Sequence, residues 1–362
     1  MSRACRQAIH ASLRERLLNK AIIQLNQVKT HFPYRKNWRG QPAEWLRAVD
    51  GVNLDIVAGE CLGLVGESGC GKSTLGRSIL CMAPVVSGSV LFHGKEIQGL
   101  NDAKLRPLRP KMQMVFQDPR ASLNPKMTVL QILQEALFIC PGFDHRRSLE
   151  RSAELLDTVD LRPEHLFRYP HEFSGGQQQR ICIARALATE PEFIVFDEAT
   201  SALDVSVQAQ VINLMADLQQ RLNLTYLFIS HDLSIMEQVC HRIAVMYAGR
   251  IMEVQRAQAL FGSPRHPYTK VLRDALPVAD PRQRRELATL PGEVPSLVHP
   301  PSGCRFHTRC VYATDVCRDA EPRMSVIDTG NWVRCHHHEH LQANDELKAQ
   351  PLNRSTEIKE TP

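Results

Sequence analysis

The chain has 362 residues, of which 43% are hydrophobic and 23% are charged, and this average globular composition excludes wholesale disorder and fibrous classes. Its 44 Lys and Arg residues outnumber its 39 Asp and Glu residues by only five, so the net charge gives little support for a nucleic-acid partner. No apolar run approaches the roughly 18 residues that span a bilayer, so we expect no transmembrane segment.

The first 20 residues carry five basic side chains and one acid, whereas the 25 basic and 25 acidic residues of 21–262 balance. The apolar residues of 1–20 are interspersed with Arg, Gln and His and do not form the core of a secretory signal. We therefore expect an N-terminal extension, whose role the sequence leaves open, and a reducing cytoplasm in which thiols stay free or bind metal.

Short apolar runs alternate with helical patterns across residues 21–262, which is typical of an α/β domain. The runs cover residues 61–65, 113–116, 193–196 and 226–229, and each is followed by polar, Gly-rich or acidic residues. The carboxyl ends of strands are where α/β folds place their chemistry. Between the second and third runs, a helical pattern at about residues 128–169 is long enough for a separate subdomain.

Residues 66–73 follow the first apolar run, precede a helical pattern and match the phosphate-binding pattern G-x-x-x-x-G-K-[ST]. The glycines let backbone N–H groups converge on phosphate oxygens, Lys72 can reach the β and γ phosphates, and Ser73 can ligate Mg²⁺. The sequence therefore predicts a nucleoside triphosphate site formed by Gly66, Glu67, Ser68, Gly69, Cys70, Gly71, Lys72, Ser73 and Thr74.

The apolar run 193–196 ends in two carboxylates, Asp197 and Glu198. Alone, this would be a buried strand with a solvated acidic end. Beside a phosphate loop, the pair indicates hydrolysis: Asp197 is predicted to hold Mg²⁺ through water, and Glu198 to polarise the attacking water as general base.

A second anion site is predicted where Ser174, Gly175, Gly176 and Gln177 open a helical pattern that runs to about residue 189. The chain's own phosphate loop does not require a second such site. The redundancy makes sense if these residues serve the nucleotide of another subunit, with ATP held between two chains.

These motifs, in this order, resemble the ATP-binding cassette (ABC) family over about residues 22–262. The segments that complete the resemblance are 115–119 with Gln117, 201–204 ending in Asp204, and 230–232 with His231. The resemblance implies an α/β, ABC-type P-loop ATPase fold, with a RecA-like core, an antiparallel β subdomain and a helical subdomain at about residues 118–175. We find no internal repeat, so one cassette is expected per chain.

The resemblance also implies the roles of individual residues. His231 would contact the γ-phosphate and orient the water with Glu198, and Gln117 would sense Mg²⁺ and the γ-phosphate. Asp204 would link the two subunits, and Phe32, with Tyr34 as the alternative, would stack on adenine. The implied catalytic set is Glu198, His231 and Gln117, and the implied Mg²⁺ set is Ser73, Gln117 and Asp197.

Two positions depart from the pattern of the family. Phe173 begins the signature segment where many members have Leu, and Ala199 stands where close relatives usually have Pro. Neither departure removes a catalytic group.

Residues 264–269, 290–295 and 300–306 resemble the C-terminal extension of oligopeptide and dipeptide importer ATPases, and an insertion at 36–51 is most like the F-type ATPase of oligopeptide permeases. The resemblance implies a peripheral subunit that drives peptide uptake at the cytoplasmic face of the bacterial inner membrane. The implied partners are a second, paralogous ATPase, two transmembrane permease subunits and an external solute-binding protein, without nucleic acid.

Two alternatives stay open. The first is an importer ATPase for nickel, glutathione or antimicrobial peptides, because substrate selection occurs outside this chain. The second is a soluble, non-transport ABC ATPase that acts on DNA or ribosomes, although such proteins usually carry two cassettes, a long coiled coil or zinc insertions. The sequence decides neither the transported substrate nor whether the ATPase dimer is homomeric.

Four of the eleven cysteines, Cys304, Cys310, Cys317 and Cys335, fall within one 32-residue window. Their spacing matches neither the C-x-x-C pattern of zinc sites nor that of ferredoxins. The resemblance implies a [4Fe-4S] cluster, with Zn²⁺ or four reduced thiols as alternatives. The predicted domains are an extension at 1–20, an ATPase domain at 21–262, a small Cys-containing C-terminal domain at 263–340 and a disordered tail at 341–362.

Overall fold

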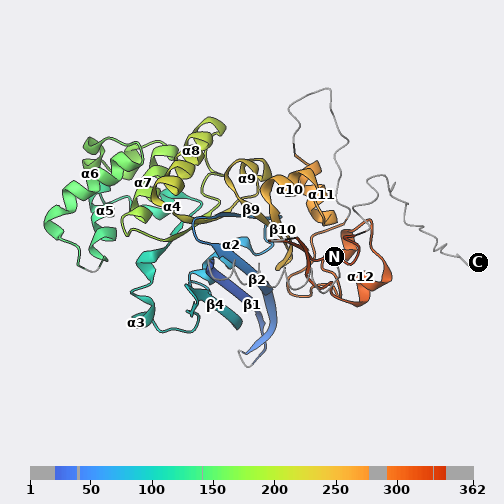
Figure 1. Cartoon of the computed structure of the whole chain (residues 1–362). Helices are drawn as coiled ribbons and strands as arrows, with labels where there is room; N and C mark the ends of the chain where they lie inside the picture. The colour runs from blue at the N-terminus through green and yellow to red at the C-terminus, as the bar shows by residue number, and fades with distance from the viewer. Residues whose placement is uncertain (1–20, 39–40, 141, 277–291, 329, 340–362) are drawn as a thin grey trace, which may run out of the picture.

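The computed structural model describes residues 21–38, 41–140, 142–276, 292–328 and 330–339 (Figure 1). The predicted extension at 1–20 and tail at 341–362 lie outside the described residues. No helix among the described residues is long and apolar enough to cross a membrane.

An eight-stranded sheet runs through the middle of the protein in the order β11-β12-β10-β9-β3-β8-β7-β6. The five strands from β9 to β6 are parallel, and β10, β12 and β11 continue the sheet antiparallel. The strands are β3 (Cys61–Val65), β6 (Met112–Val115), β7 (Phe193–Asp197), β8 (Thr225–Ile229), β9 (Arg242–Tyr247), β10 (Arg250–Arg256), β11 (Ser325–Asp328) and β12 (Asn331–Val333). The four predicted apolar runs coincide with β3, β6, β7 and β8 to within one residue at each end.

Alternate residues of the parallel strands pack on opposite faces of the sheet. In β3, Leu62 and Leu64 belong to one apolar cluster, whereas Cys61 and Val65 belong to the other. The strands are therefore buried on both faces, which explains their continuous apolar sequence.

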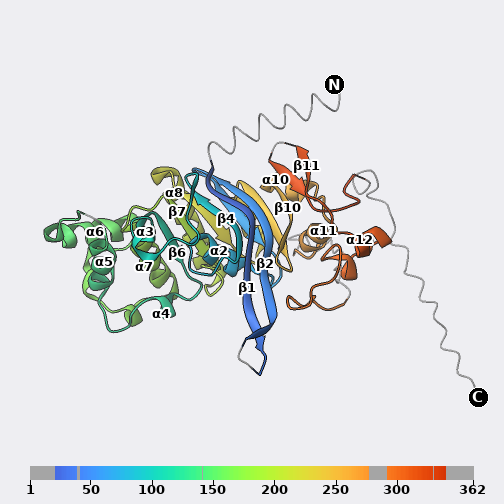
Figure 2. The same ribbon diagram turned by 90° about the horizontal axis from the view of Figure 1, so that it is seen from below.

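One face of the sheet is covered by α2 (Lys72–Ile79) and by a second, four-stranded antiparallel sheet with the order β2-β1-β4-β5. Its strands are β1 (Ala21–Lys36), β2 (Pro42–Val57), β4 (Ser87–Phe92) and β5 (Lys95–Glu96). The β1/β2 hairpin projects beyond the body of the molecule in both views (Figures 1 and 2). This agrees with the antiparallel β subdomain that the resemblance implies.

The opposite face is covered by helices, as Figure 1 shows. These are α7 (Gly175–Leu187), α8 (Val205–Leu222), α9 (Leu233–Val239), α10 (Ala257–Gly262) and α11 (Pro267–Asp274). Three further helices, α4 (Pro119–Ser122), α5 (Val129–Phe138) and α6 (Ser148–Thr158), gather with α7 at one end of the molecule. A capping box between Thr128 and Gln131 begins α5, in agreement with the predicted helical stretch. A short helix, α3 (Asp102–Leu105), precedes β6.

The C-terminal segment, which we define as residues 292–328 and 330–339, packs against the rest of the chain. It contains α12 (Asp315–Asp319) and the hairpin β11/β12, and Val333 and Trp332 of β12 pair with Glu253 and Val254 of β10. Phe306 joins the same apolar cluster as the helices over the central sheet. The fading of periodicity after residue 262 gave no indication of these two strands, because they are only four and three residues long.

Candidate active site

The phosphate loop connects β3 to α2, as its sequence predicts. Gly71 caps α2 with a backbone φ of 107°, and a Cβ atom there would lie 2.0 Å from the carbonyl oxygen of Ala48. Only glycine fits this position, because the conformation is left-handed and the neighbouring atom is backbone. The Lys72 ammonium is buried and donates hydrogen bonds to the carbonyl oxygens of Gly66, at 2.8 Å, and Glu67, at 3.1 Å. The loop and its cation are thus preformed.

Ser73 and Asp197 meet at the start of α2. The Ser73 hydroxyl donates to Asp197 Oδ1 at 2.6 Å, and Arg77 lies 4.0 Å from Asp197 Oδ2. Burial raises the pKa of Asp197, and the Ser73 hydrogen bond and Arg77 only partly oppose this. A hydroxyl and a carboxylate beside a phosphate loop form a donor set that suits Mg²⁺.

The loops that follow three neighbouring strands, β6, β7 and β8, converge at Glu198. Gln117 Nε2, after β6, donates to Glu198 Oε2 at 3.1 Å, and His231 Nδ1, after β8, lies 3.7 Å from the same oxygen. Glu198 has a backbone φ of 48°, and its N–H donates to the carbonyl oxygen of Ile229. A left-handed conformation in a non-glycine residue costs on the order of 1 kcal/mol, so the surrounding structure must hold Glu198 in place.

The signature residues form the N-terminus of α7. The Ser174 hydroxyl accepts from the Gln177 N–H, and the Gln177 side chain accepts from the Ser174 N–H, which completes a capping box. Asp204 is the N-cap residue of α8, where its side chain makes no capping hydrogen bond. Within the described residues, no hydrogen bond joins Ser174, Gly175, Gly176 or Gln177 to the phosphate loop. The hydrogen bonds of this predicted anion site are thus made within its own helix N-terminus.

The two candidates for adenine stacking both lie on the projecting hairpin. Phe32 of β1 pairs with Leu46 of β2 and is half-buried, whereas the Tyr34 side chain is 57% exposed.

Two contacts to the phosphate loop come from residues that the sequence did not indicate. The hydroxyl of Tyr268, on α11, accepts from the Glu67 N–H, and Arg309, in the C-terminal segment, donates to the Glu67 carboxylate. These residues follow Glu67 by 201 and 242 positions, so no local pattern links them to the loop.

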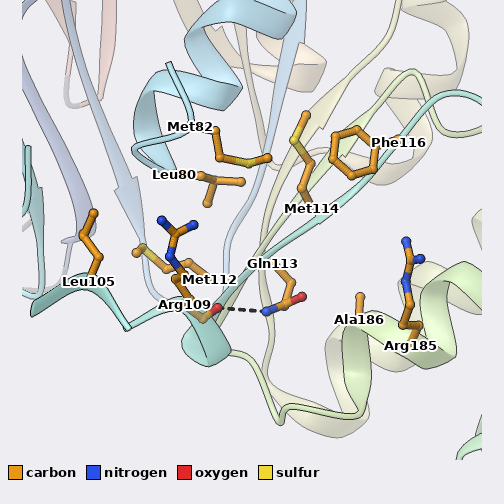
Figure 3. Close-up of a pocket in the computed structure, with 10 residues that line it drawn as sticks. All are labelled: Leu80, Met82, Leu105, Arg109, Met112, Gln113, Met114, Phe116, Arg185 and Ala186. Carbon is orange, nitrogen blue, oxygen red and sulfur yellow. Dashed lines mark hydrogen bonds between the residues drawn. The ribbon is translucent and has the colours of Figure 1, made fainter. Parts of the chain in front are cut away.

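A pocket of about 280 Å³ opens between the end of α2, β6 and α7. Leu80 and Met82, which follow α2 in the chain, face Met114 of β6 and Phe116, the residue after β6 (Figure 3). The remaining lining residues are Leu105, Arg109, Met112, Gln113, Arg185 and Ala186. Because Phe116 directly precedes Gln117, the pocket adjoins the catalytic loop.

All four clustered cysteines lie in the C-terminal segment. Burial, together with neighbouring thiols of the same set, raises the pKa of Cys304 to about 11 and the pKa values of Cys310 and Cys335 to about 12. No group of three or more His, Cys, Asp or Glu side chains in the described part of the chain is arranged to hold a metal ion. Metal binding by these cysteines therefore stays a prediction.

The chain matches two family models, described as "ABC transporter" over residues 49–201 and "Oligopeptide/dipeptide transporter, C-terminal region" over residues 252–317. It is 48% identical, over 88% of its length and 90% of the relative's, to the probable peptide ABC transporter ATP-binding protein y4tS of Sinorhizobium fredii. It is 47% identical, over 88% of its length and 97% of the relative's, to the oligopeptide transport ATP-binding protein AppF of Bacillus subtilis.

Solved structures resemble the cassette part of the chain. A dimeric, post-hydrolysis structure of the ATP-binding cassette MJ0796, bound to ADP and phosphate, aligns with a TM-score of 0.57 and 28% identity. The alignment covers 65% of this chain and 98% of the cassette.

Proposed function

This chain belongs to the ABC transporter ATP-binding family, and from that premise we propose that it is the ATP-hydrolysing subunit of an importer that drives peptide uptake across the cytoplasmic membrane. The convergence of Gln117 and His231 on the Glu198 carboxylate, beside Ser73 and Asp197, is the observation that carries this proposal. The matched oligopeptide/dipeptide transporter region at residues 252–317 favours peptides over the other substrates and over a non-transport role.

The geometry supports general-base catalysis by Glu198. Its carboxylate accepts a hydrogen bond from the Gln117 amide and has His231 nearby. It can therefore take a proton from an attacking water, and His231 would contact the γ-phosphate. Lys72 neutralises the β and γ phosphates. Mg²⁺, held by Ser73, Asp197 and Gln117, would supply further neutralisation of phosphate charge.

The signature residues form no hydrogen bond with the chain's own phosphate loop among the described residues, and this supports a dimer. A capped, glycine-rich helix N-terminus has free backbone N–H groups for the phosphates of a nucleotide on the facing subunit. We propose that Ser174–Gln177 and Asp204 act across that interface, and that the partner is a paralogous ATPase.

The pocket beside Phe116 supports docking of a permease. Its wall of methionine, leucine and phenylalanine side chains suits the apolar face of a short helix, and its position next to Gln117 would link the occupant to the nucleotide.

We place the subunit on the cytoplasmic face of the inner membrane, with residues 21–262 as the cassette and 263–340 as an accessory domain. An external binding protein would deliver the peptide.

A Glu198→Gln variant tests the catalytic part of the proposal. We expect ATP binding to persist while turnover falls about 100-fold or more, because glutamine cannot accept the proton. Glu190→Gln is the matched control, since Glu190 is an exposed glutamate that pairs with Arg151. Undiminished peptide uptake by Glu198→Gln, with the partner ATPase disabled at its equivalent residue, would overturn the assignment.

We also propose that the four clustered cysteines bind a [4Fe-4S] cluster. The thiols of Cys304, Cys310 and Cys335 lie near one another and near Cys317, although no three of them are arranged around a common metal position in the described residues. Four cysteine sulfurs are the usual ligands of such a cluster. The buried Nε of Arg334 lacks a hydrogen-bond acceptor, and Arg334 lies within electrostatic range of Cys304, so the site already contains a cation that would offset the negative charge of the cluster.

Iron, zinc and sulfide analysis of anaerobically purified protein tests this second proposal. We expect about four iron and four sulfide per chain, and loss of both in a Cys317→Ser variant. Cys140→Ser, at a half-buried cysteine of the helical end, is the control that should keep the cluster. Well-folded protein without iron or sulfide would contradict the proposal, and zinc in its place would favour the alternative.

A further inference from the structure

Three groups of Glu67, in the phosphate loop, form hydrogen bonds with other residues. Its carbonyl oxygen accepts from Lys72, its N–H donates to the hydroxyl of Tyr268 at 2.9 Å, and its carboxylate accepts from Arg309 Nη1 at 2.8 Å. The first contact lies within the loop, whereas the other two come from chain beyond residue 262. The loop that cradles phosphate is therefore fixed in part by residues outside the cassette.

The Tyr268 contact rests on a buried aromatic cluster. The Tyr268 ring lies 4.7 Å from the ring of Tyr247 and 5.4 Å from that of Phe306, between ring centroids. Tyr247 ends β9, a neighbour of β3 in the sheet, and Phe306 belongs to the C-terminal segment. Side chains packed in this way move little, so the Tyr268 hydroxyl is a fixed acceptor for the loop.

The Arg309 guanidinium is likewise preorganised. The residue is 7% exposed, its Nη1 also donates to the Tyr247 hydroxyl at 3.4 Å, and its guanidinium lies over the Tyr247 ring. Four positions earlier, Arg305 forms an ion pair with Asp50 of β2 at 2.5 Å, which anchors this part of the segment to the cassette. Arg309 also directly precedes Cys310, so the predicted cluster ligand and the contact to Glu67 are neighbours in the chain.

From these contacts we propose that Arg309 and Tyr268 are positioning residues of the phosphate loop, through which α11 and the C-terminal segment set the affinity of the cassette for ATP. The proposal rests on the nucleotide-binding role of the loop. The physical reason is twofold. Arg309 neutralises a carboxylate that would otherwise repel the phosphates, and Tyr268 holds the Glu67 peptide in the orientation that the loop needs.

The test measures equilibrium binding of MgATP to the full-length chain in the Glu198→Gln background, where turnover does not deplete the nucleotide. We expect Arg309→Met to raise the dissociation constant about tenfold and Arg309→Lys to restore part of the loss. Arg309→Met combined with Glu67→Gln should bind ATP more tightly than Arg309→Met alone, because the unpaired carboxylate is gone. Tyr268→Phe keeps the ring in the cluster, removes only the acceptor and should also weaken binding.

Arg318→Met is the matched control, because Arg318 is an exposed arginine of the same segment that pairs with Asp315. With Glu198 intact, we expect Arg309→Met to raise the KM for ATP while kcat changes less than about twofold. A variant with a lower unfolding temperature but an unchanged dissociation constant would assign Arg309 a structural role and overturn the proposal. Should Arg309→Met fail to fold, wild-type ATP binding by both Arg309→Lys and Tyr268→Phe would overturn it as well. Failure of Glu198→Gln to retain ATP would instead contradict the proposed function, so the two failures are distinguishable.

Discussion

Gly176 shows how a single missing side chain sets the geometry of the signature segment. A Cβ atom at Gly176 would lie 2.2 Å from Val207 Cγ1 on α8, whereas a Cβ at Gly175 would lie 3.4 Å from its nearest neighbour, Leu203. Valine is stiff about χ1, so it cannot easily turn away from an added methyl group. The close crossing of α7 and α8 therefore depends on glycine at this position.

We predict that Gly176→Ala destabilises the protein by about 1–3 kcal/mol, the usual cost of overpacking, and lowers ATPase activity by displacing the N-terminus of α7. Val207→Ala in the same chain should restore most of the stability because it removes the clashing atom. Thermal unfolding and steady-state ATPase assays measure both effects. Gly175→Ala is the control for the gain in helix propensity. Equal destabilisation by Gly176→Ala with and without Val207→Ala would show that the clash is not the cause.

For single residues, the sequence was sufficient to identify motifs whose members lie close together in the chain. The phosphate loop, the acidic pair and the glycine-rich segment after Ser174 are each defined within a few residues, and the structure places Lys72 within the loop and Ser73 beside Asp197. Arg309 and Tyr268 could not be identified in this way. Their contacts to Glu67 arise only when distant segments fold together.

Among the elements, β2, β10 and the C-terminal segment are joined by a network of charges that is buried at Asp50, Arg305 and Arg334 and reaches the surface at Glu321. Asp50 of β2 pairs with Arg250 of β10 and with Arg305, and Arg250 and Arg334 both pair with Glu321. Burial alone would raise the pKa of Asp50, but Arg250 and Arg305 lower it below its ordinary value of 3.8. The ionised carboxylate is thus favoured in the folded chain, where it pairs with arginines of two other elements.

Because the pKa of Asp50 is lower in the folded than in the unfolded chain, its contribution to stability is present above the unfolded value and is lost as pH falls through the folded value. We predict that Asp50→Asn lowers the free energy of unfolding at pH 7 by about 3 kcal/mol, since it leaves Arg305 buried without its charged partner. It should also remove part of the acid sensitivity below about pH 4. Urea unfolding of both proteins at pH 7 and below about pH 4 measures these two effects.

Arg305→Met added to Asp50→Asn should recover part of the lost stability, because no unpaired guanidinium then remains beside residue 50. An identical pH dependence in Asp50→Asn and the unmodified chain would contradict the role assigned to this carboxylate.

The elements differ in how far the sequence predicts them. Strands β3, β7 and β8 are buried throughout and are accordingly continuous apolar runs. Strand β11 alternates half-buried and exposed residues, and its register with β12 is irregular. A pattern this short and mixed cannot be distinguished from that of a loop. For that reason the sequence did not predict that β12 and β11 extend the central sheet.

For the whole molecule, assembly with the permeases is the property that most directly separates transport from other ATPase roles. The Met82 side chain is 51% exposed and lines the pocket beside Phe116. We predict that Met82→Glu abolishes co-purification with the permease subunits while ATP binding is retained, because a charged side chain then replaces one that forms the apolar part of the docking surface with Leu80, Met114 and Phe116.

Val86→Glu is the matched control, since Val86 is also 51% exposed, lies four residues away and does not line the pocket. Pull-down of the complex from membranes, followed by ATP binding to the recovered chain, measures both outcomes. Equal recovery of permeases with Met82→Glu and with Val86→Glu would place the docking surface elsewhere.

The pairing of β12 with β10 has a consequence for any attempt to isolate the cassette. Cutting the chain after residue 262 would remove β12 and leave the outer backbone N–H and C=O groups of β10 facing solvent. A strand edge of this kind is a template for pairing with other chains, so the shortened protein should tend to self-associate through β-strand addition. The C-terminal strands thus cover the edge of β10 and keep it from pairing with strands of other molecules.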